Sequence, residues 1–202
     1  MGEIRISSII LILAIWGAYA DEPLPQGSVC LGKEELVKFE VYIQDKSSGP
    51  NATVWEVARA EITSGSASSF GLVDLMDSQV TAEADPSSQE IGRLQGPVFF
   101  ADMKELAVTA NLNFYFTNGI YNGSTLTVLG RNPLMNDERE VPVVAGTGVF
   151  RLARGYAITT TPDKTGGLVL LNMCFTFLNI PSLNILLHDL YACNKSSGLA
   201  RY

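Results

Sequence analysis

The chain has 202 residues, enough for one domain with a substantial core. Hydrophobic residues make up 47% and charged residues 17%, which is the composition of a globular protein rather than a disordered one. The net charge of −7 argues against nucleic-acid binding, because binding phosphates requires a basic stripe and none is visible.

The first twenty residues have the pattern of a secretory signal peptide. Arg5 precedes an apolar run from Ile9 to Trp16, and Ala18-Tyr19-Ala20 is a small-x-small cleavage site. The alternative, a membrane anchor, would need about 20 apolar residues, and this run is far shorter. We therefore expect residues 1–20 to be removed, a protein secreted into the extracellular space or cell wall, and no membrane association.

Secretion permits disulfides and N-linked glycans. Three cysteines are present, and Cys174 is expected to be a buried free thiol because it lies within an apolar run. A bridge between Cys30 and Cys193 would tie the two ends of the mature chain together, but sequence alone does not fix the connectivity. Among the N-x-[ST] tripeptides, those at Asn51 and Asn122 fall in predicted turns and are the expected glycosylation sites, the alternative being chance occurrence.

After a flexible lead-in over residues 21–35, the stretch Leu36–Gln44 alternates between apolar and polar residues. This is the pattern of a half-buried strand, and Asp45 follows it with the parity of the apolar face. Further strands are expected over Val54–Ile62 and Phe70–Met76, and the polar residues 77–90 are expected to form a loop.

The second half of the chain continues in the same manner. Strands are expected over Gln95–Asp102, Val108–Thr117, Thr125–Leu129, Arg139–Ala145, Val149–Thr160 and Leu168–Leu178. Asn122-Gly123 and Gly146-Thr147-Gly148 are strong turn signals, because glycine accepts positive φ at little cost. With no helical periodicity between them, these short strands indicate an all-β sandwich or closed barrel, and the pattern alone does not choose between the two. Residues 181–202 form an atypical tail, in which Leu183–Tyr191 could be a short amphipathic helix.

Several chemistries are excluded. The single histidine, His188, lies in the tail, so neither a histidine-based triad nor a zinc site is expected within the strands. Gly146-x-Gly148 leads into a strand and is a hairpin turn rather than a dinucleotide fingerprint. No haem, flavin or copper motif is visible, so we expect no cofactor and no intrinsic oxidase activity.

The candidate site is therefore a cavity with a few polar groups. If the apolar face that carries Asp45 lines a cavity, burial would raise the pKa of its carboxyl and allow it to act as an acid; the alternative is an aspartate that caps a turn. Arg139 has the parity of the apolar residues that follow it, so it could face the same cavity, or begin a solvated strand. Aromatic walls are expected among Phe99, Phe100, Phe114, Phe116 and Tyr156, unless these are plain core residues.

Several separated motifs, in order, closely resemble the signature of plant dirigent proteins. They are Gly92-Arg93-Leu94-Gln95-Gly96, Tyr121–Leu126, Gly130-Arg131-Asn132, Arg139-Glu140, and Gly146-Thr147-Gly148-x-Phe150-x-x-Ala153-Arg154-Gly155-Tyr156. Leu94 stands where the family usually has alanine. The resemblance extends from about Leu36 to Leu178.

This resemblance implies an eight-stranded up-and-down antiparallel β-barrel over residues 36–180 that associates as a homotrimer. Asp45 and Arg139 match positions that many dirigent proteins use in their pocket. Asn132 stands where lignan-forming members often have a second catalytic aspartate, and asparagine cannot donate a proton as an acid. Some members carry an end-to-end bridge comparable to Cys30–Cys193, which favours that pairing.

The function implied is control over the coupling of monolignol-derived phenoxy radicals in phenylpropanoid, lignan or lignin biosynthesis and in defence. A separate laccase or peroxidase would supply the radicals. Two alternatives remain: a non-catalytic scaffold or phenolic-binding protein in lignin deposition, and a dehydrating cyclase that acts through a quinone methide.

Overall fold

The computed structural model describes residues 33–165 and 168–180. Within these ranges the backbone forms nine strands and three short 3-10 helices. The strands are β1 (Glu35–Lys46), β2 (Val54–Arg59), β3 (Leu72–Thr81), β4 (Glu90–Phe100), β5 (Ala107–Phe116), β6 (Thr125–Pro133), β7 (Arg139–Gly146), β8 (Arg154–Thr165) and β9 (Leu168–Asn179). The 3-10 helices are η1 (Glu61–Gly65), η2 (Gly119–Tyr121) and η3 (Gly148–Phe150).

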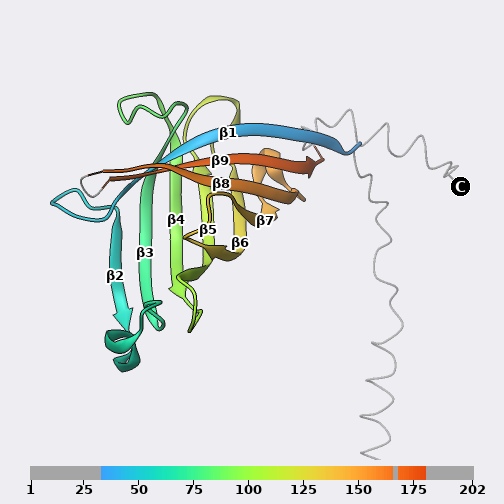
Figure 1. The fold of residues 1–202 in the computed structure, drawn as a ribbon. Helices are drawn as coiled ribbons and strands as arrows, with labels where there is room; N and C mark the ends of the chain where they lie inside the picture. Colours follow the sequence, from blue (N-terminus) through green and yellow to red (C-terminus); the bar gives the residue numbers. More distant parts are fainter. Residues whose placement is uncertain (1–32, 166–167, 181–202) are drawn as a thin grey trace, which may run out of the picture. The chain divides into compact units, whose positions relative to one another are not determined.

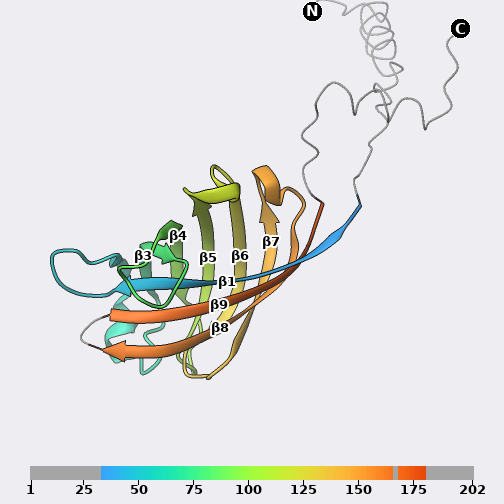
Figure 2. The same cartoon turned by 90° about the horizontal axis from the view of Figure 1, so that it is seen from above.

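All nine strands belong to one antiparallel sheet, in which neighbours in the sequence are mostly neighbours in space. The order is β1-β9-β8-β7-β6-β5-β4-β3-β2, with an additional pairing between β1 and β3. That additional pairing closes eight of the described strands into a barrel, which confirms the predicted fold class (Figures 1 and 2). Closure joins Tyr42–Gln44 of β1 to Gln79–Thr81 of β3, whereas β1 and β9 pair along their whole length.

β2 lies outside the closed ring. It pairs with the first half of β3, from Leu72 to Met76, whereas β1 pairs with Gln79–Thr81 at the end of the same strand. Because β2 has a neighbour on one side only, its residues are largely exposed, and Trp55 retains 60% of its accessible surface. β2 therefore does not contribute to the interior of the barrel.

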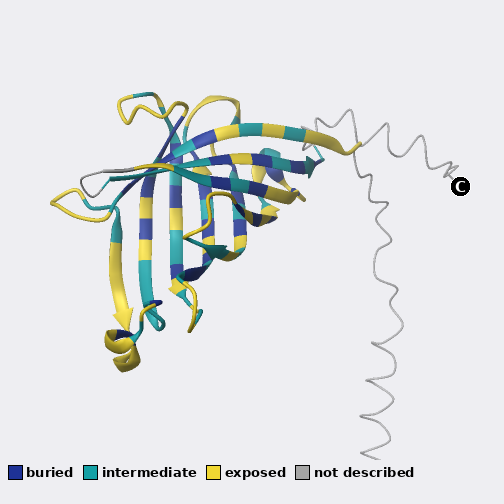
Figure 3. Cartoon of the chain, in the orientation of Figure 1, coloured by how far each residue is buried: buried dark blue, intermediate teal, exposed yellow. Residues whose placement is uncertain are grey.

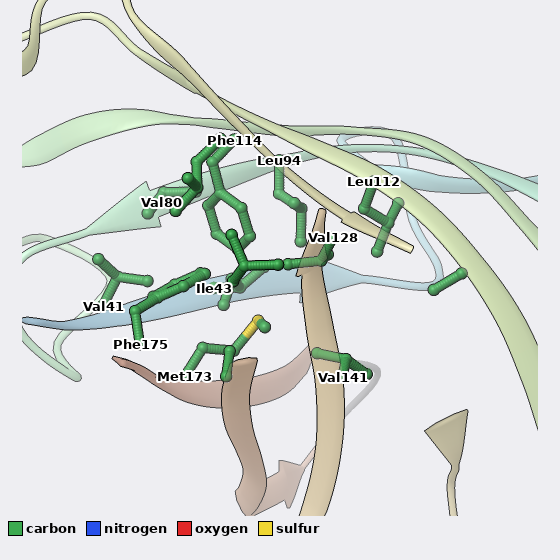
Figure 4. Close-up of a cluster of buried hydrophobic side chains, with 14 of the residues drawn as sticks. Val41, Ile43, Val80, Leu94, Leu112, Phe114, Val128, Val141, Met173 and Phe175 are labelled. Carbon is green, nitrogen blue, oxygen red and sulfur yellow. The ribbon is translucent and has the colours of Figure 1, made fainter. Parts of the chain in front are cut away.

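The barrel strands alternate between an inward apolar face and an outward face, as the sequence predicted. In β5 the side chains of Val108, Ala110, Leu112, Phe114 and Phe116 are all buried, and the residues between them are more exposed. A similar banding runs along the other barrel strands (Figure 3), except where β1 and β3 close the barrel and successive residues are buried. The inward residues meet in one core, of which Figure 4 labels Val41, Ile43, Val80, Leu94, Leu112, Phe114, Val128, Val141, Met173 and Phe175.

Aromatic side chains fill one part of this interior. The ring centroids of Phe39 and Phe175 lie 5.0 Å apart, as do those of Phe114 and Phe175, and those of Tyr121 and Phe150 lie 4.9 Å apart. Such contacts contribute packing energy beyond the burial of area. Tyr121 and Phe150 come from η2 and η3, so these two helices cover the aromatic part of the core.

The turn between β7 and β8 explains why the sequence needs glycine there. Gly148 has φ = +61°, a conformation that side-chain-bearing residues rarely adopt. At Gly146 an added Cβ would lie 2.7 Å from Cβ of Phe150 and 2.9 Å from the carbonyl oxygen of Thr125. Glycine at this position lets η3 pack directly onto β6.

Some predicted boundaries were wrong. Residues 77–90 are not all loop, because β3 continues to Thr81 and β4 begins at Glu90. The predicted strand Val149–Thr160 is interrupted, since η3 and a left-handed Leu152 (φ = +66°) precede β8. The predicted strand Val54–Ile62 ends at Arg59, and η1 follows it.

Cys174 is also a correction. It lies on β9 between the buried Met173 and Phe175, so strand alternation turns its thiol outward, where it is exposed rather than buried. The signal peptide (1–20), the tail (181–202), and Cys30 and Cys193 lie outside the described residues. Among the helices in the described part of the chain, none has the length and apolar character required to cross a membrane.

Candidate active site inside the barrel

Asp45 is buried near the end of β1, on the face that also carries Val41 and Ile43. Only 7% of its surface is exposed. Burial raises the pKa of its carboxyl from 3.8 to about 6, and a hydrogen bond from the Ser78 side chain opposes this rise. Its Oδ1 atom is buried with no hydrogen-bond partner among the described residues. The carboxyl is therefore an acid that titrates near neutral pH and keeps one oxygen for a ligand.

Arg139, the first residue of β7, is a buried cation. Its Nη2 donates a hydrogen bond to Oγ1 of Thr161 at 2.7 Å, and its Nη1 donates to the carbonyl oxygen of Asn136 at 3.3 Å. Nε is buried and, within the described residues, makes no hydrogen bond. Burial lowers the pKa of the guanidinium, and no carboxylate of the described chain forms an ion pair with it. A buried charge without a counter-ion is costly, so the site favours an electron-rich ligand atom beside Arg139.

Asn132 lies near the end of β6, the strand that neighbours the β7 strand of Arg139. The ladder between β6 and β7 covers only Leu126–Val128 and Val143–Gly146, so Asn132 and Arg139 both lie beyond it, on adjacent strands. Oδ1 of Asn132 is buried and has no partner in the described structure. The asparagine thus presents a hydrogen-bond acceptor to the interior at the position that the sequence analysis singled out.

A pocket of about 430 Å³ opens next to Arg139. Its walls are the β6–β7 connection and the end of β8, with apolar surface from Leu134, Met135 and Pro162 and polar groups from Asn136, Asp137, Glu138, Thr160 and Thr161. The volume is within the range of pockets that bind small molecules. Arg139 belongs both to this pocket and to the inward face of β7, whereas Asp45, Asn132 and Thr159 do not line the pocket.

The predicted aromatic walls are divided between interior and surface. Phe114 is fully buried in the aromatic part of the core. Phe99 and Tyr156 are 39% and 41% exposed, and each follows or precedes a buried residue of its strand, Val98 and Ala157. In this chain they therefore lie on the outer face of the barrel, where they cannot line its interior.

Sequence reasoning missed Thr159. It lies on β8 directly opposite Arg139, is 2% exposed, and its hydroxyl has no hydrogen-bond partner among the described residues. The sequence hardly indicates that Thr159 faces inward, because Thr159-Thr160-Thr161 is a run of identical residues with no apolar alternation. Only the spacing from Ala157, two residues earlier on the same face, could have placed it inside.

The predicted glycosylation positions Asn51 and Asn122 are exposed and lie in turns. In the ranges that the structure covers, no cluster of three or more histidine, cysteine, aspartate or glutamate side chains is arranged to hold a metal ion. The residues described above give the interior an acid, a guanidinium, an amide and a hydroxyl, and further buried polar side chains, among them Ser78 and Asn179, lie on the inward faces of β3 and β9.

Comparisons with known proteins agree with this architecture. The sequence model of the family described as Dirigent-like protein matches residues 36–176. Dirigent protein 11 of Arabidopsis thaliana is 44% identical over 128 residues, which are 63% of this chain and 66% of that protein. Dirigent protein 1 of the same plant is 38% identical over 161 residues, 80% of this chain and 87% of that protein.

Relatives named for a specific reaction are also found. Pterocarpan synthase 1 of Glycine max is 34% identical over 126 residues, covering 62% of this chain and 68% of that protein. A solved structure of a pterocarpan synthase dirigent protein superposes with a TM-score of 0.66 at 28% identity, over 78% of this chain and 96% of the other. With the family model matching most of the barrel, this chain belongs to the dirigent protein family.

Proposed function

We propose that this protein directs the stereochemistry of reactions of phenolic quinone methides and of the phenoxy radicals that give rise to them. The observation that carries the proposal is the buried Asp45, an acid with a pKa of about 6 and an unpartnered oxygen on the inner surface of a closed barrel. Membership of the dirigent family supports the same role.

In the radical reaction, a separate laccase or peroxidase removes one electron and one proton from each of two phenols. The barrel holds the two radicals so that one carbon–carbon bond forms, giving a product with two quinone methides. Holding both partners in one geometry converts a random encounter into an oriented one. The protein needs no redox centre for this step, because the oxidant is supplied from outside.

Ring closure then requires proton transfer. A hydroxyl of the coupled intermediate adds to the methide carbon and loses its proton, while the carbonyl oxygen of the methide gains one and becomes a phenol. Asp45 in its acid form is suited to give the proton, and its carboxylate to take one back, because its pKa of about 6 lies near neutral pH. Arg139 is suited to hold the carbonyl oxygen, on which negative charge develops.

Addition of the purified protein to coniferyl alcohol and laccase tests this role. We expect one enantiomer of a coupled product to exceed the other on chiral chromatography, and Asp45→Asn to reduce the excess at an unchanged rate of phenol oxidation. Products that stay racemic and in unchanged proportions would refute the proposal. The variant Asn132→Asp restores the second acid that lignan-forming members often have, and is expected to increase the share of cyclised product.

The similarity to pterocarpan synthases favours a second candidate, a dehydrating cyclase. A benzylic alcohol of an isoflavonoid would lose water to give a quinone methide, and a phenol of the same molecule would add to it, with no change in oxidation state. Asp45 would again transfer the proton, and Arg139 would again hold the carbonyl oxygen of the quinone methide. Turnover of a hydroxylated isoflavonoid alcohol in the absence of any oxidase distinguishes this reaction from radical coupling, whereas binding without turnover of either substrate would favour a non-catalytic phenolic-binding role.

We also propose that the protein acts after secretion to the cell wall, as a homotrimer in which a Cys30–Cys193 bridge ties the two ends of each chain together. The signal-like segment over residues 1–20 supports secretion. Exposure of Asn51 and Asn122 in turns supports glycosylation at both. Mass spectrometry of protein from a plant host, before and after enzymatic removal of N-glycans and under non-reducing conditions, tests the processing; light scattering tests the trimer.

A further inference from the structure

We propose that Thr159 is a substrate-binding residue that works as a pair with Arg139, each donating a hydrogen bond to the same oxygen of the ligand. This inference rests on the proposed function, because the oxygen in question is the carbonyl oxygen of the quinone methide. It adds a residue that neither the sequence motifs nor the resemblance indicated.

The first support is the register of the sheet. Thr159 of β8 lies directly opposite Arg139 of β7, and residues directly opposite in an antiparallel pair share one face, with Cβ atoms about 5 Å apart. On its other side Thr159 lies opposite Met173 of β9, an inward residue labelled in Figure 4. All three residues are at most 4% exposed. The threonine hydroxyl therefore belongs to the interior, on the strand next to the guanidinium.

The second support is the hydrogen-bond inventory. Buried hydroxyls almost always have a partner, because a buried polar group without one is costly. Thr161, two residues further along β8, follows this rule and accepts from Nη2 of Arg139. Thr159 does not follow it, and neither does Nε of Arg139, when the partners are sought among the described residues. Two unpaired groups thus lie on adjacent strands at the same level of the barrel.

The two groups define the ligand atom that fits them. Arginine Nε–H can only donate, so the atom beside it must be an acceptor, and a threonine hydroxyl can donate to the same atom. A carbonyl oxygen that gains negative charge as the methide is attacked is such an atom. Two fixed donors that strengthen their bonds as charge develops act as an oxyanion hole does. Asp45, which reaches the interior from β1 on the far side of β9, is left free to exchange the proton.

A structural role for Thr159 makes the opposite prediction for stability. If the hydroxyl were part of the folded network, Thr159→Val would remove a bond and destabilise the protein. If it is reserved for the ligand, valine has nearly the same shape and removes only an unpaired polar group, so the free protein should melt at an equal or higher temperature. Thr81 supplies the reference for a structural threonine, because its hydroxyl bonds the carbonyl oxygen of Glu83 at 2.7 Å and the side chain of Gln44 at 3.1 Å.

The experiment compares wild type, Thr159→Val, Thr159→Ser and the outward-facing control Thr176→Val. Melting temperatures are measured without ligand, and the affinity for coniferyl alcohol is measured by calorimetry without oxidase. We expect Thr159→Val to keep its melting temperature, to bind roughly three- to tenfold more weakly, and to give a smaller enantiomeric excess with laccase. Thr159→Ser, which keeps the hydroxyl, should recover most of the affinity and of the enantiomeric excess. Thr176→Val should resemble wild type.

The outcomes separate this inference from the proposed function. Unchanged affinity and selectivity in Thr159→Val, with a wild type that binds and directs, would overturn the role of Thr159 alone. A fall in melting temperature of more than about 4 °C would also overturn it, since that is the loss expected for a structural bond. A wild type that binds coniferyl alcohol without altering the products would refute stereochemical control, while the affinity ratio would still decide whether Thr159 contacts the ligand.

Discussion

The raised pKa of Asp45 makes a specific prediction about stability. Burial places the pKa at about 6 in the folded protein, compared with an ordinary value of 3.8. The folded state therefore holds its proton more tightly than the unfolded state. Because the folded state binds more protons between these two values, the contribution of Asp45 to stability is greatest below pH 3.8 and is lost as the pH rises through about 6. The difference of about two pH units corresponds to about 3 kcal/mol of unfolding free energy at pH 7.5.

Asp45→Asn removes this titration and keeps nearly the same shape. We expect the variant and the wild type to respond differently to pH in urea unfolding experiments: their difference in unfolding free energy should change by about 2.4 kcal/mol in favour of the variant between pH 4 and pH 7.5. Comparison with wild type at each pH cancels the contribution of every other carboxyl. Asp77→Asn, at an exposed position paired with Arg93, is the matched control and should change stability by less than about 1 kcal/mol.

Parallel stability curves for wild type and Asp45→Asn would refute the reasoning, since they would mean that Asp45 has the same pKa in both states. A loss of selectivity in Asp45→Asn could then not be attributed to the removal of an acid from the barrel. A difference in stability that is already present at pH 4 would not count for or against the prediction, because it reports only the packing of the amide; the change of that difference with pH is what tests it.

Two further predictions follow from the packing. Gly146→Ala should destabilise the protein by about 2 kcal/mol or more, because its Cβ would meet Phe150 at 2.7 Å, whereas Gly65→Ala, with no atom within 4 Å, should change urea unfolding little. Phe99→Ser and Tyr156→Ser should leave the affinity for coniferyl alcohol within about twofold of wild type, because both side chains lie on the outer face; a tenfold loss in calorimetry would place them in the site after all.

Strand alternation predicted much of this structure. The parity argument for Asp45 and Arg139 requires only that a strand keep its period of two, and both residues are buried with the apolar sets that precede or follow them. Where the inward residues are themselves polar, a strand shows no apolar alternation in its sequence. Ser78 lies in a stretch that reads as a loop, yet it is fully buried on the inward face of β3 with Met76 and Val80. Thr81 faces the other way and is buried where its hydroxyl bonds the Gln44 side chain and the carbonyl oxygen of Glu83.

Other features depend on contacts distant in sequence. Cys174 lies in an apolar run, and only its position between two inward residues of β9 shows that it faces outward. Thr159 becomes notable only when the register places it opposite Arg139. The closure of the barrel depends on three residue pairs between β1 and β3, and no local pattern distinguishes that closure from an open sandwich.

The most direct test of the account is a crystal structure of the protein with coniferyl alcohol bound. We predict the phenol inside the barrel, reached through the pocket beside Arg139, with one ligand oxygen within hydrogen-bond distance of Nε of Arg139 and a second polar atom of the ligand facing the carboxyl of Asp45. The opposite result would be a phenol bound only on the outer face, over Phe99 or Tyr156, with the interior polar groups bonded to one another. It would contradict the central claim that the interior of the barrel binds and orients the phenolic ligand.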